Sequence, residues 1–194
     1  MKLHEHEVRE RSGNLLILFF SFMSYRILGV DPGSRLTGWA VLDLPSFGRT
    51  FNLISCGLID AKNKEFPSNL GKIYEELREV MEEYSPGIMS LESVFSGVNP
   101  ASLIKLSQAR GVICLLSSVF NIKLKEYSPR FVKKSIAGYG DANKQQMKEA
   151  LNIICASKSS NIKAFLNDNM DSNISDALAI AVCCATDMSN FIYS

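Results

Sequence analysis

An aspartate at the end of an apolar segment is the residue of this chain whose position says most about chemistry. The apolar stretch 25–30 predicts a buried β-strand, and Asp31 follows it directly. A carboxylate there has little water around it, so its ionised form needs a nearby cation or hydrogen-bond donors. Pro32 and Gly33 predict a tight turn into a second strand over 36–43. The pattern predicts a β-hairpin that presents one acid at a sheet end, although an Asp that merely begins a turn would look the same.

Two further acids occupy comparable positions. Glu92 lies among apolar neighbours in a predicted strand over 88–94, and Asp176 begins a predicted helix over 173–187. Three acids at the ends of separate elements favour a cation between them, and hard oxygen ligands suit Mg²⁺ or Mn²⁺. Taken singly, Glu92 would also suit an ion pair, and Asp176 an acid at a helix start. Small residues would let this helix lie close to a sheet: Ala177, Ala179 and Ala181.

Two polar residues just before Asp176 are candidates for a place beside it. Asn173 is three residues earlier and therefore shares a helical face with Asp176, where its amide oxygen offers a neutral metal ligand. Asp171 is five residues earlier, so it is expected to point elsewhere if the helix already includes it.

Charge is distributed unevenly along the chain, although the formal net charge is only +1. Residues 1–104 carry ten Lys/Arg and thirteen Asp/Glu, and residues 149–194 carry two Lys/Arg and five Asp/Glu. Residues 105–148 carry nine Lys/Arg and only two acids, Glu126 and Asp141. A basic centre between acidic flanks favours a polyanionic partner over a membrane, although a solvated helix face would have the same composition.

Cysteine and histidine usage exclude several kinds of site. The five cysteines are odd in number and form no CxxC pair, so neither a disulfide framework nor a zinc site is expected, and a reducing cytoplasm is the simplest location. The only histidines are His4 and His6, so a triad or general base that uses histidine elsewhere in the chain is excluded.

The N-terminal residues differ from the rest of the chain, which is long enough for one domain. Residues 1–14 are polar with mixed charge, and the apolar run 15–22 is less than half of the roughly twenty residues that a membrane span needs. We therefore expect residues 1–22 to be an extension upstream of a true start at Met23. An anchor or an added element is the alternative. The domain is expected over 23–187, with a short tail over 188–194.

The remaining periodic segments predict an α/β domain. Further strands are expected over 51–59, 88–94 and 122–127, and helices over 67–84, 99–120, 129–137, 143–156 and 173–187. Three strands followed by alternating helices and strands predict a mixed five-stranded sheet flanked by helices, with the first three strands antiparallel.

Five segments, in order, resemble the RuvC family of Holliday-junction resolvases. No one of them is specific alone, but their collinear order from about residue 24 to 185 is highly specific. They are GVDPGSRLTG at 29–38, LESVF at 91–95, KLSQARG at 105–111, EYSPRFVKK at 126–134 with GYG at 138–140 and Lys144, and SDALAIA at 175–181.

The resemblance implies an RNase H-like fold and a Mg²⁺-dependent endonuclease, with two ions per subunit, that cuts four-way DNA junctions in recombination and repair. It implies metal binding by Asp31, Glu92 and Asp176. Asn173 occupies the place where the family usually has a fourth, acidic or histidine, ligand, so metal affinity would be lowered. Lys133 and Lys144 would contact the scissile region. DNA contacts are implied for Phe95, Arg110, Arg130, Lys133, Lys134 and Lys144. The implied partners are a second copy of the chain and a branch-migration helicase complex of the RuvA and RuvB type.

Two other functions remain open at this stage, and the length of the chain argues against a third. A related nuclease that acts on RNA would share the first motif but not the segment at 105–111. A junction-binding homologue with weak cleavage would be consistent with Asn173. An actin-like ATPase or nucleotide-binding module would need glycine-rich phosphate loops in a second lobe, for which 194 residues leave no room.

Overall fold

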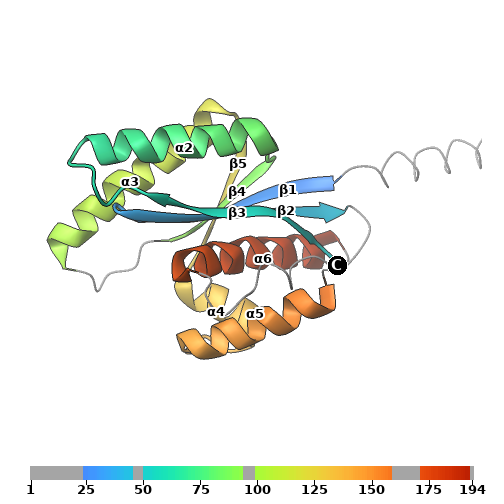
Figure 1. The fold of residues 1–194 in the computed structure, drawn as a ribbon. Helices are drawn as coiled ribbons and strands as arrows, with labels where there is room; N and C mark the ends of the chain where they lie inside the picture. The colour runs from blue at the N-terminus through green and yellow to red at the C-terminus, as the bar shows by residue number, and fades with distance from the viewer. Residues whose placement is uncertain (1–23, 46–49, 94–98, 159–170, 193–194) are drawn as a thin grey trace, which may run out of the picture.

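The computed structural model describes residues 24–45, 50–93, 99–158 and 171–192, and these form three layers (Figure 1). A central sheet has helices α2 and α3 on one side, and α6 with α4 and α5 beyond it on the other. The strands are β1 (Ser24–Asp31), β2 (Leu36–Pro45), β3 (Asn52–Asp60), β4 (Ile88–Glu92) and β5 (Lys123–Tyr127). The helices are α2 (Ser68–Tyr84), α3 (Pro100–Val119), α4 (Pro129–Ala137), α5 (Lys144–Lys158) and α6 (Ser172–Ile192).

The sheet has five strands in the order β3-β2-β1-β4-β5. β1 pairs antiparallel with β2, and β2 with β3, whereas β4 is parallel to β1 and β5 is parallel to β4. The mixed sheet and its antiparallel first three strands confirm the predicted fold class. Because β1 is the middle strand and β4 adjoins it, their ends lie at the centre of one sheet edge.

Local sequence signals explain where several helices begin. Asn99 caps α3 by accepting a hydrogen bond from the amide of Ala101, and Pro100 takes the first helical position. Ser128 caps α4 in the same way, through the amide of Phe131. Gly138 ends α4 in a left-handed conformation (φ 87°), which glycine adopts without strain.

Alternation along the strands gives the sheet two apolar faces. Leu28 and Val30 of β1 pack with α2 and α3, whereas Ile27 packs in the cluster that includes the buried residues of α6. Every residue of α6 from Ala177 to Ala185 is buried, so this part of the helix is enclosed on all sides. The helix that carries Asp176 is thus fixed against the sheet by its own apolar residues.

Two glycines allow α6 to lie directly on the sheet. A Cβ atom at Gly29 of β1 would come within 2.3 Å of the Ala177 carbonyl oxygen. A Cβ atom at Gly38 of β2 would come within 2.0 Å of the Asn173 carbonyl oxygen. Both contacts involve backbone, which cannot give way as a flexible side chain would, so this packing depends on glycine at both positions.

The predicted boundaries need small corrections. β4 ends at Glu92 rather than at residue 94, so Glu92 stands at the strand's end and not inside it. α6 continues to Ile192 rather than ending at Asp187, so residues 188–192 of the predicted tail are helical. The predicted extension over 1–22 lies outside the described residues. Within the described ranges, no helix is both long enough and apolar enough to cross a bilayer.

Candidate active site

Strand register brings the first two predicted acids side by side. Val30 of β1 pairs with Leu91 of β4 in parallel register, so the residues that follow them, Asp31 and Glu92, end neighbouring strands together. Val30 and Leu91 both pack on the side of α2 and α3. Successive side chains in a strand point to opposite faces, so both carboxylates project toward the α6 side of the sheet.

The close packing of α6 brings the third acid to the same place. Asp176 precedes Ala177, whose carbonyl oxygen lies against Gly29, two residues before Asp31. The three predicted acids therefore meet at one end of the sheet, from β1, β4 and α6.

Burial and mutual repulsion perturb the ionisation of these acids. Burial, followed by the charges of Asp176 and Glu92, raises the pKa of Asp31 to about 7, against the opposing effect of Lys144. Burial and the charge of Asp176 likewise raise the pKa of Glu92, and Lys133 opposes this rise. Such perturbation of several acids in one place is typical of a functional site.

Asp176 forms the open side of this cluster. Its side chain reaches solvent, yet protein covers the rest of it, and this partial loss of water raises its pKa. The charge of Asp171 adds to the rise, whereas the charge of Lys144 lowers it. A ligand that enters from solvent would therefore meet Asp176 first and the more buried Asp31 last.

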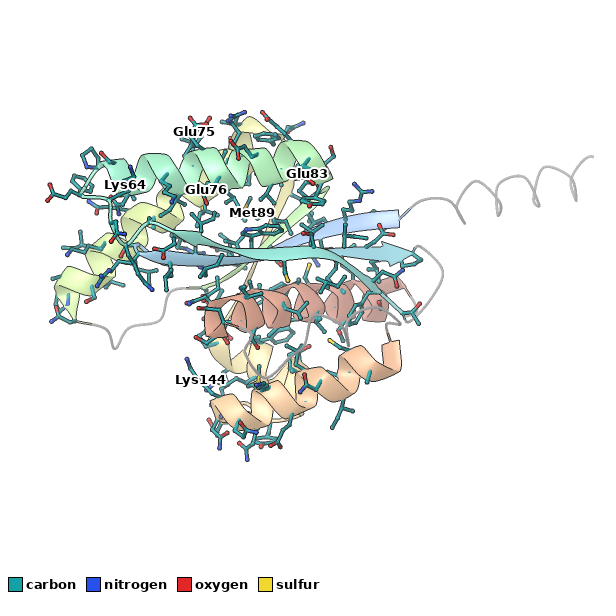
Figure 2. The ribbon with its side chains drawn as sticks, viewed as in Figure 1. Lys64, Glu75, Glu76, Glu83, Met89 and Lys144 are labelled. Atoms are coloured by element: carbon teal, nitrogen blue, oxygen red, sulfur yellow. The ribbon has the colours of Figure 1, made fainter. Side chains whose placement is uncertain are left out.

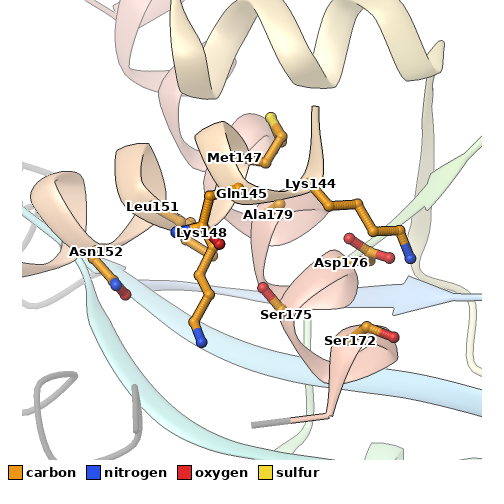
Figure 3. A pocket seen from close by; sticks show the side chains of 10 residues that line it. All are labelled: Lys144, Gln145, Met147, Lys148, Leu151, Asn152, Ser172, Ser175, Asp176 and Ala179. Atoms are coloured by element: carbon orange, nitrogen blue, oxygen red, sulfur yellow. The ribbon is translucent and has the colours of Figure 1, made fainter. Parts of the chain in front are cut away.

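Two lysines predicted to act at the scissile region lie beside the acids. Lys133 of α4 and Lys144 of α5 line a cleft of about 420 Å³ together with Glu92 and Asp176. Figure 3 shows the side chain of Lys144 extending from the start of α5 toward Asp176, beside a smaller adjoining cavity. The cleft thus combines carboxylates, which suit metal ions, with ammonium groups, which suit phosphate.

The donor set fits a divalent cation in its chemistry. Asp31, Glu92 and Asp176 offer hard oxygen atoms, and a cation among them would relieve the repulsion that raises their pKa values. In the described part of the chain, however, no group of three or more Asp, Glu, His or Cys side chains is already arranged to hold a metal ion.

Asp171 is a further acid beside this site. It precedes α6 rather than lying inside it, and its carboxylate accepts hydrogen bonds from the amide nitrogen and the side-chain Nδ2 of Asn173, at 2.8 and 2.7 Å. Its charge raises the pKa values of Asp31 and Asp176. The expectation that Asp171 points elsewhere was conditional on a helix that includes it, and this condition does not apply because α6 begins at Ser172. The preference of Asp for helix N-caps was the available signal.

Asn173 lies beside this cluster with its amide already engaged. Its Nδ2 donates to Asp171, and its backbone carbonyl oxygen lies over Gly38. The metal-ligand role predicted for Asn173 stays a prediction.

Arg110 has an environment that favours a different role from the predicted DNA contact. Its guanidinium donates to the backbone carbonyl of Glu92 and to the Glu126 carboxylate. Only 13% of the side chain is exposed, which leaves little of it for DNA. Arg110 ties α3 to the ends of β4 and β5 and holds the strand end that carries Glu92, and its predicted DNA contact stays a prediction.

Two further predicted DNA contacts, Arg130 and Lys134, are exposed on α4. Arg130 is highly exposed and approaches Asp141 at 3.9 Å, and Lys134 is exposed on α4. Neither lines the cleft described above. Phe95 lies outside the described residues.

Solved structures identify the fold. The structure of Thermus thermophilus RuvC in complex with Holliday junction substrate matches at a TM-score of 0.75 and 22% identity, over 87% of this chain and 97% of that one. The yeast mitochondrial Holliday junction resolvase matches at a TM-score of 0.63 and 14% identity, over 93% of this chain and 90% of that one. The fold is the RNase H-like fold shared with these resolvases.

Sequence comparison then identifies the family. The family model for crossover junction endodeoxyribonuclease RuvC matches residues 27–184. The relative from Ehrlichia canis is 39% identical over 166 residues, which cover 85% of this chain and 99% of that one. The relative from Chloroherpeton thalassium is 40% identical over 161 residues, which cover 80% of this chain and 79% of that one. Both relatives carry the name crossover junction endodeoxyribonuclease RuvC, and this chain belongs to the RuvC family.

Proposed function

We propose that this protein is a Mg²⁺-dependent endonuclease that resolves four-way DNA junctions by paired symmetric nicks, in homologous recombination and DNA repair. The observation that carries the proposal is the meeting of Asp31, Glu92 and Asp176 at one sheet end, in a chain of the RuvC family. Lys133 and Lys144 beside them supply the positive charge that a phosphodiester needs.

The three carboxylates would hold two Mg²⁺ ions, and Mn²⁺ would substitute because it takes the same oxygen ligands. When bound, divalent ions activate water for in-line attack and stabilise the leaving 3′ oxygen, which yields products with 5′ phosphates. Asp31 would be one of these ligands, and a bound cation would offset the loss of water and the neighbouring acids that raise its pKa.

The basic side chains would position the DNA strand for this reaction. Lys144 and Lys133 flank the carboxylates on the α5 and α4 sides, and their ammonium groups would hold oxygens of the scissile phosphate. Arg130 and Lys134 are exposed farther out on α4 and would contact the backbone beyond it.

A homodimer would place two such sites on a two-fold symmetric junction. An exposed apolar stripe on the C-terminal half of α3 supports this assembly. Leu115 and Val119 are 56% and 60% exposed, one helical turn apart, and a Cβ atom at Gly111, one turn earlier, would meet only open space. A second copy of the chain is the occupant that paired nicks require.

The same role implies further partners and a location. A branch-migration helicase complex of the RuvA and RuvB type would deliver the junction. A chromosomal DNA substrate and five free cysteines support a cytoplasmic location.

A panel of substrates tests the proposal. The purified protein is incubated with end-labelled four-way junction, linear duplex of the same sequence, and RNA, each with Mg²⁺ or with EDTA. We expect symmetric nicks in the junction alone, and only with Mg²⁺. Cleavage of RNA in preference to the junction would reassign the substrate, and junction binding without cleavage would leave a binding protein.

A further inference from the structure

A second basic cleft, of about 700 Å³, lies beside the acidic cluster and is used by none of the roles assigned above. Its walls are the β1–β2 turn, the loop between β3 and α2, and the first turns of α3. Four cations line it, with Glu65 as the one acid among its lining residues. The cations are Arg35, Lys62, Lys64 and Lys105.

These four cations are available to an external partner. All four side chains are exposed, and none lies within 4.0 Å of an acidic group in the described part of the chain. Four like charges around one cleft repel one another, and an anionic partner would relieve that repulsion.

The cleft is rigidly connected to the acidic cluster. Arg35 follows Asp31 by four residues, and the backbone of Arg35 and of the preceding Ser34 is held by hydrogen bonds. The Arg35 carbonyl accepts a hydrogen bond from the Ala61 amide at 2.8 Å, and the Ser34 carbonyl accepts one from Asn69 at 3.1 Å. A strand held in the cleft would therefore keep a fixed position relative to Asp31.

The two basic regions lie on opposite sides of the same sheet end. Figure 2 shows Lys64 above the sheet and Lys144 below it, both toward the end where β1 terminates. A polyanion that crosses the acidic cluster would meet one region before the cluster and the other after it. A nucleic-acid strand has the length and the regular charge spacing that such a path requires.

Apolar side chains beside the cations favour DNA over an acidic peptide or a free phosphate. Phe66 is 65% exposed, and Ile104 is also exposed, on opposite walls of the cleft. Sugars and base faces at a distorted site offer apolar surface alternating with phosphates.

We propose that this cleft, defined by Arg35, Lys62, Lys64 and Lys105, binds the backbone of a junction arm on the side of the cut opposite to α4 and α5. The proposal rests on the proposed function, and it assigns the cleft to positioning the DNA and not to the chemistry. Removal of its cations should weaken junction binding without changing the metal requirement.

The test uses the full chain carrying Lys62→Ala together with Lys64→Ala, with Lys72→Ala as the matched control. Lys72 lies on α2 in an ion pair with Glu76, outside the cleft. Binding of a labelled four-way junction is measured in EDTA over a range of salt concentrations, and cleavage is measured in Mg²⁺ at saturating protein.

We expect the double variant to bind roughly ten-fold more weakly at moderate salt, with a salt slope reduced by about two, because each lysine that no longer neutralises a phosphate removes about one unit of slope. Its cleavage at saturation, its Mg²⁺ requirement and its melting temperature should match those of the parent and of Lys72→Ala. Shortening the junction arms should weaken binding to the parent. It should not weaken binding to the double variant, which already lacks two of the cations that would contact the arm.

An unchanged affinity and slope, in a protein whose parent form cuts the junction, would overturn this inference and leave the proposed function standing. If the double variant keeps the parent's affinity for the junction but binds an acidic peptide more weakly than the parent does, the cleft would be reassigned to a protein partner. A parent protein that neither binds nor cuts the junction would overturn both.

Discussion

The buried carboxylate of Asp31 carries an energetic cost in the metal-free protein. Its pKa in the folded state is raised from 3.8 to about 7, so between these values the folded state binds more protons than the unfolded chain. Stability is therefore unaffected below about pH 4, decreases as pH rises through 7, and stays reduced above it. This cost is what a bound cation would relieve.

Asp31→Asn should therefore stabilise the metal-free protein while abolishing cleavage. At about pH 8 we expect a gain of roughly 2 kcal/mol, or about 4–8 °C in melting temperature, since the amide removes the charge but keeps the shape. Thermal melts of variant and parent in EDTA at about pH 4 and pH 8 measure this gain in stability, which should be absent at the lower pH. Equal melting temperatures of variant and parent at the higher pH would show that Asp31 is not under electrostatic strain.

Asn173→Asp tests the position where the family usually has a fourth ligand. An added carboxylate should lower the Mg²⁺ concentration needed for half-maximal cleavage, because it adds an anionic oxygen beside Asp176. It should also destabilise the metal-free protein slightly, since it replaces the donor that Asp171 now accepts from. A Mg²⁺ titration of cleavage and a melt in EDTA measure the two effects. A variant that needs as much metal as its parent would show that residue 173 does not reach the ions.

At the residue scale, the sequence predicted which acids meet but not every member of the group. Asp31 and Glu92 end strands, and Asp176 lies near the start of α6, and such positions are readable from local pattern. The role of Asp171 depends on whether α6 starts before or after it, and a shift of one residue decides that. The inward bonds of Arg110 join elements distant in sequence, so local pattern contained no signal for them.

At the scale of elements, the close packing of α6 on the sheet determines whether Asp176 lies near Asp31. Gly29→Ala should push α6 outward, because the new methyl group would overlap the Ala177 carbonyl. We expect a loss of about 2 kcal/mol or more in stability and a large loss of cleavage. The matched control is Gly71→Ala on exposed α2, where a Cβ atom meets nothing within 4 Å and a gain of about 0.5–1 kcal/mol is expected. Denaturant unfolding measures both changes in stability. Equal changes for Gly29→Ala and Gly71→Ala would contradict this account of the packing.

Arg110 links α3 to the strand end that carries Glu92, so its replacement should disturb catalysis more than binding. Arg110→Lys keeps the charge but cannot reach both the Glu92 carbonyl and Glu126 with a planar fork. We expect the cleavage rate at saturation to fall by about ten-fold, with the dissociation constant and salt slope for the junction unchanged. A reduced salt slope with an unchanged rate would restore the DNA contact predicted from the sequence.

Element boundaries were largely predictable, because caps and turns here use residues with strong local preferences. Asn99-Pro100 and Ser128-Pro129 start α3 and α4 where expected. The end of α6 was not predictable, since no glycine or proline follows Asp187 to stop the helix.

At the scale of the whole molecule, paired nicks require two coupled active sites. Leu115→Asp should disrupt the proposed dimer by placing a charge in the apolar stripe of α3, and the two nicks should become uncoupled or disappear. Ile153→Asp is the control, because Ile153 is 70% exposed on α5, away from this stripe. Sedimentation velocity measures the mass, and a supercoiled cruciform plasmid separates single from paired nicks. A dimer that survives Leu115→Asp would place the interface elsewhere.

The basic cleft beside the acids illustrates what the sequence could not provide at this scale. The basic segment 105–148 was recognised from composition, but Arg35, Lys62 and Lys64 belong to a stretch whose net charge is negative. Only the folded sheet brings them to Lys105.

The central claim is that Asp31, Glu92 and Asp176 form one metal-dependent site for cutting four-way junctions. Its most direct test measures junction cleavage in Mg²⁺ and junction binding in EDTA for Asp31→Asn, Glu92→Gln and Asp176→Asn. We predict that each substitution abolishes cleavage and leaves binding nearly intact, because each removes a ligand charge but little phosphate-contacting surface. Near-parental cleavage by any one of the three variants would contradict the claim.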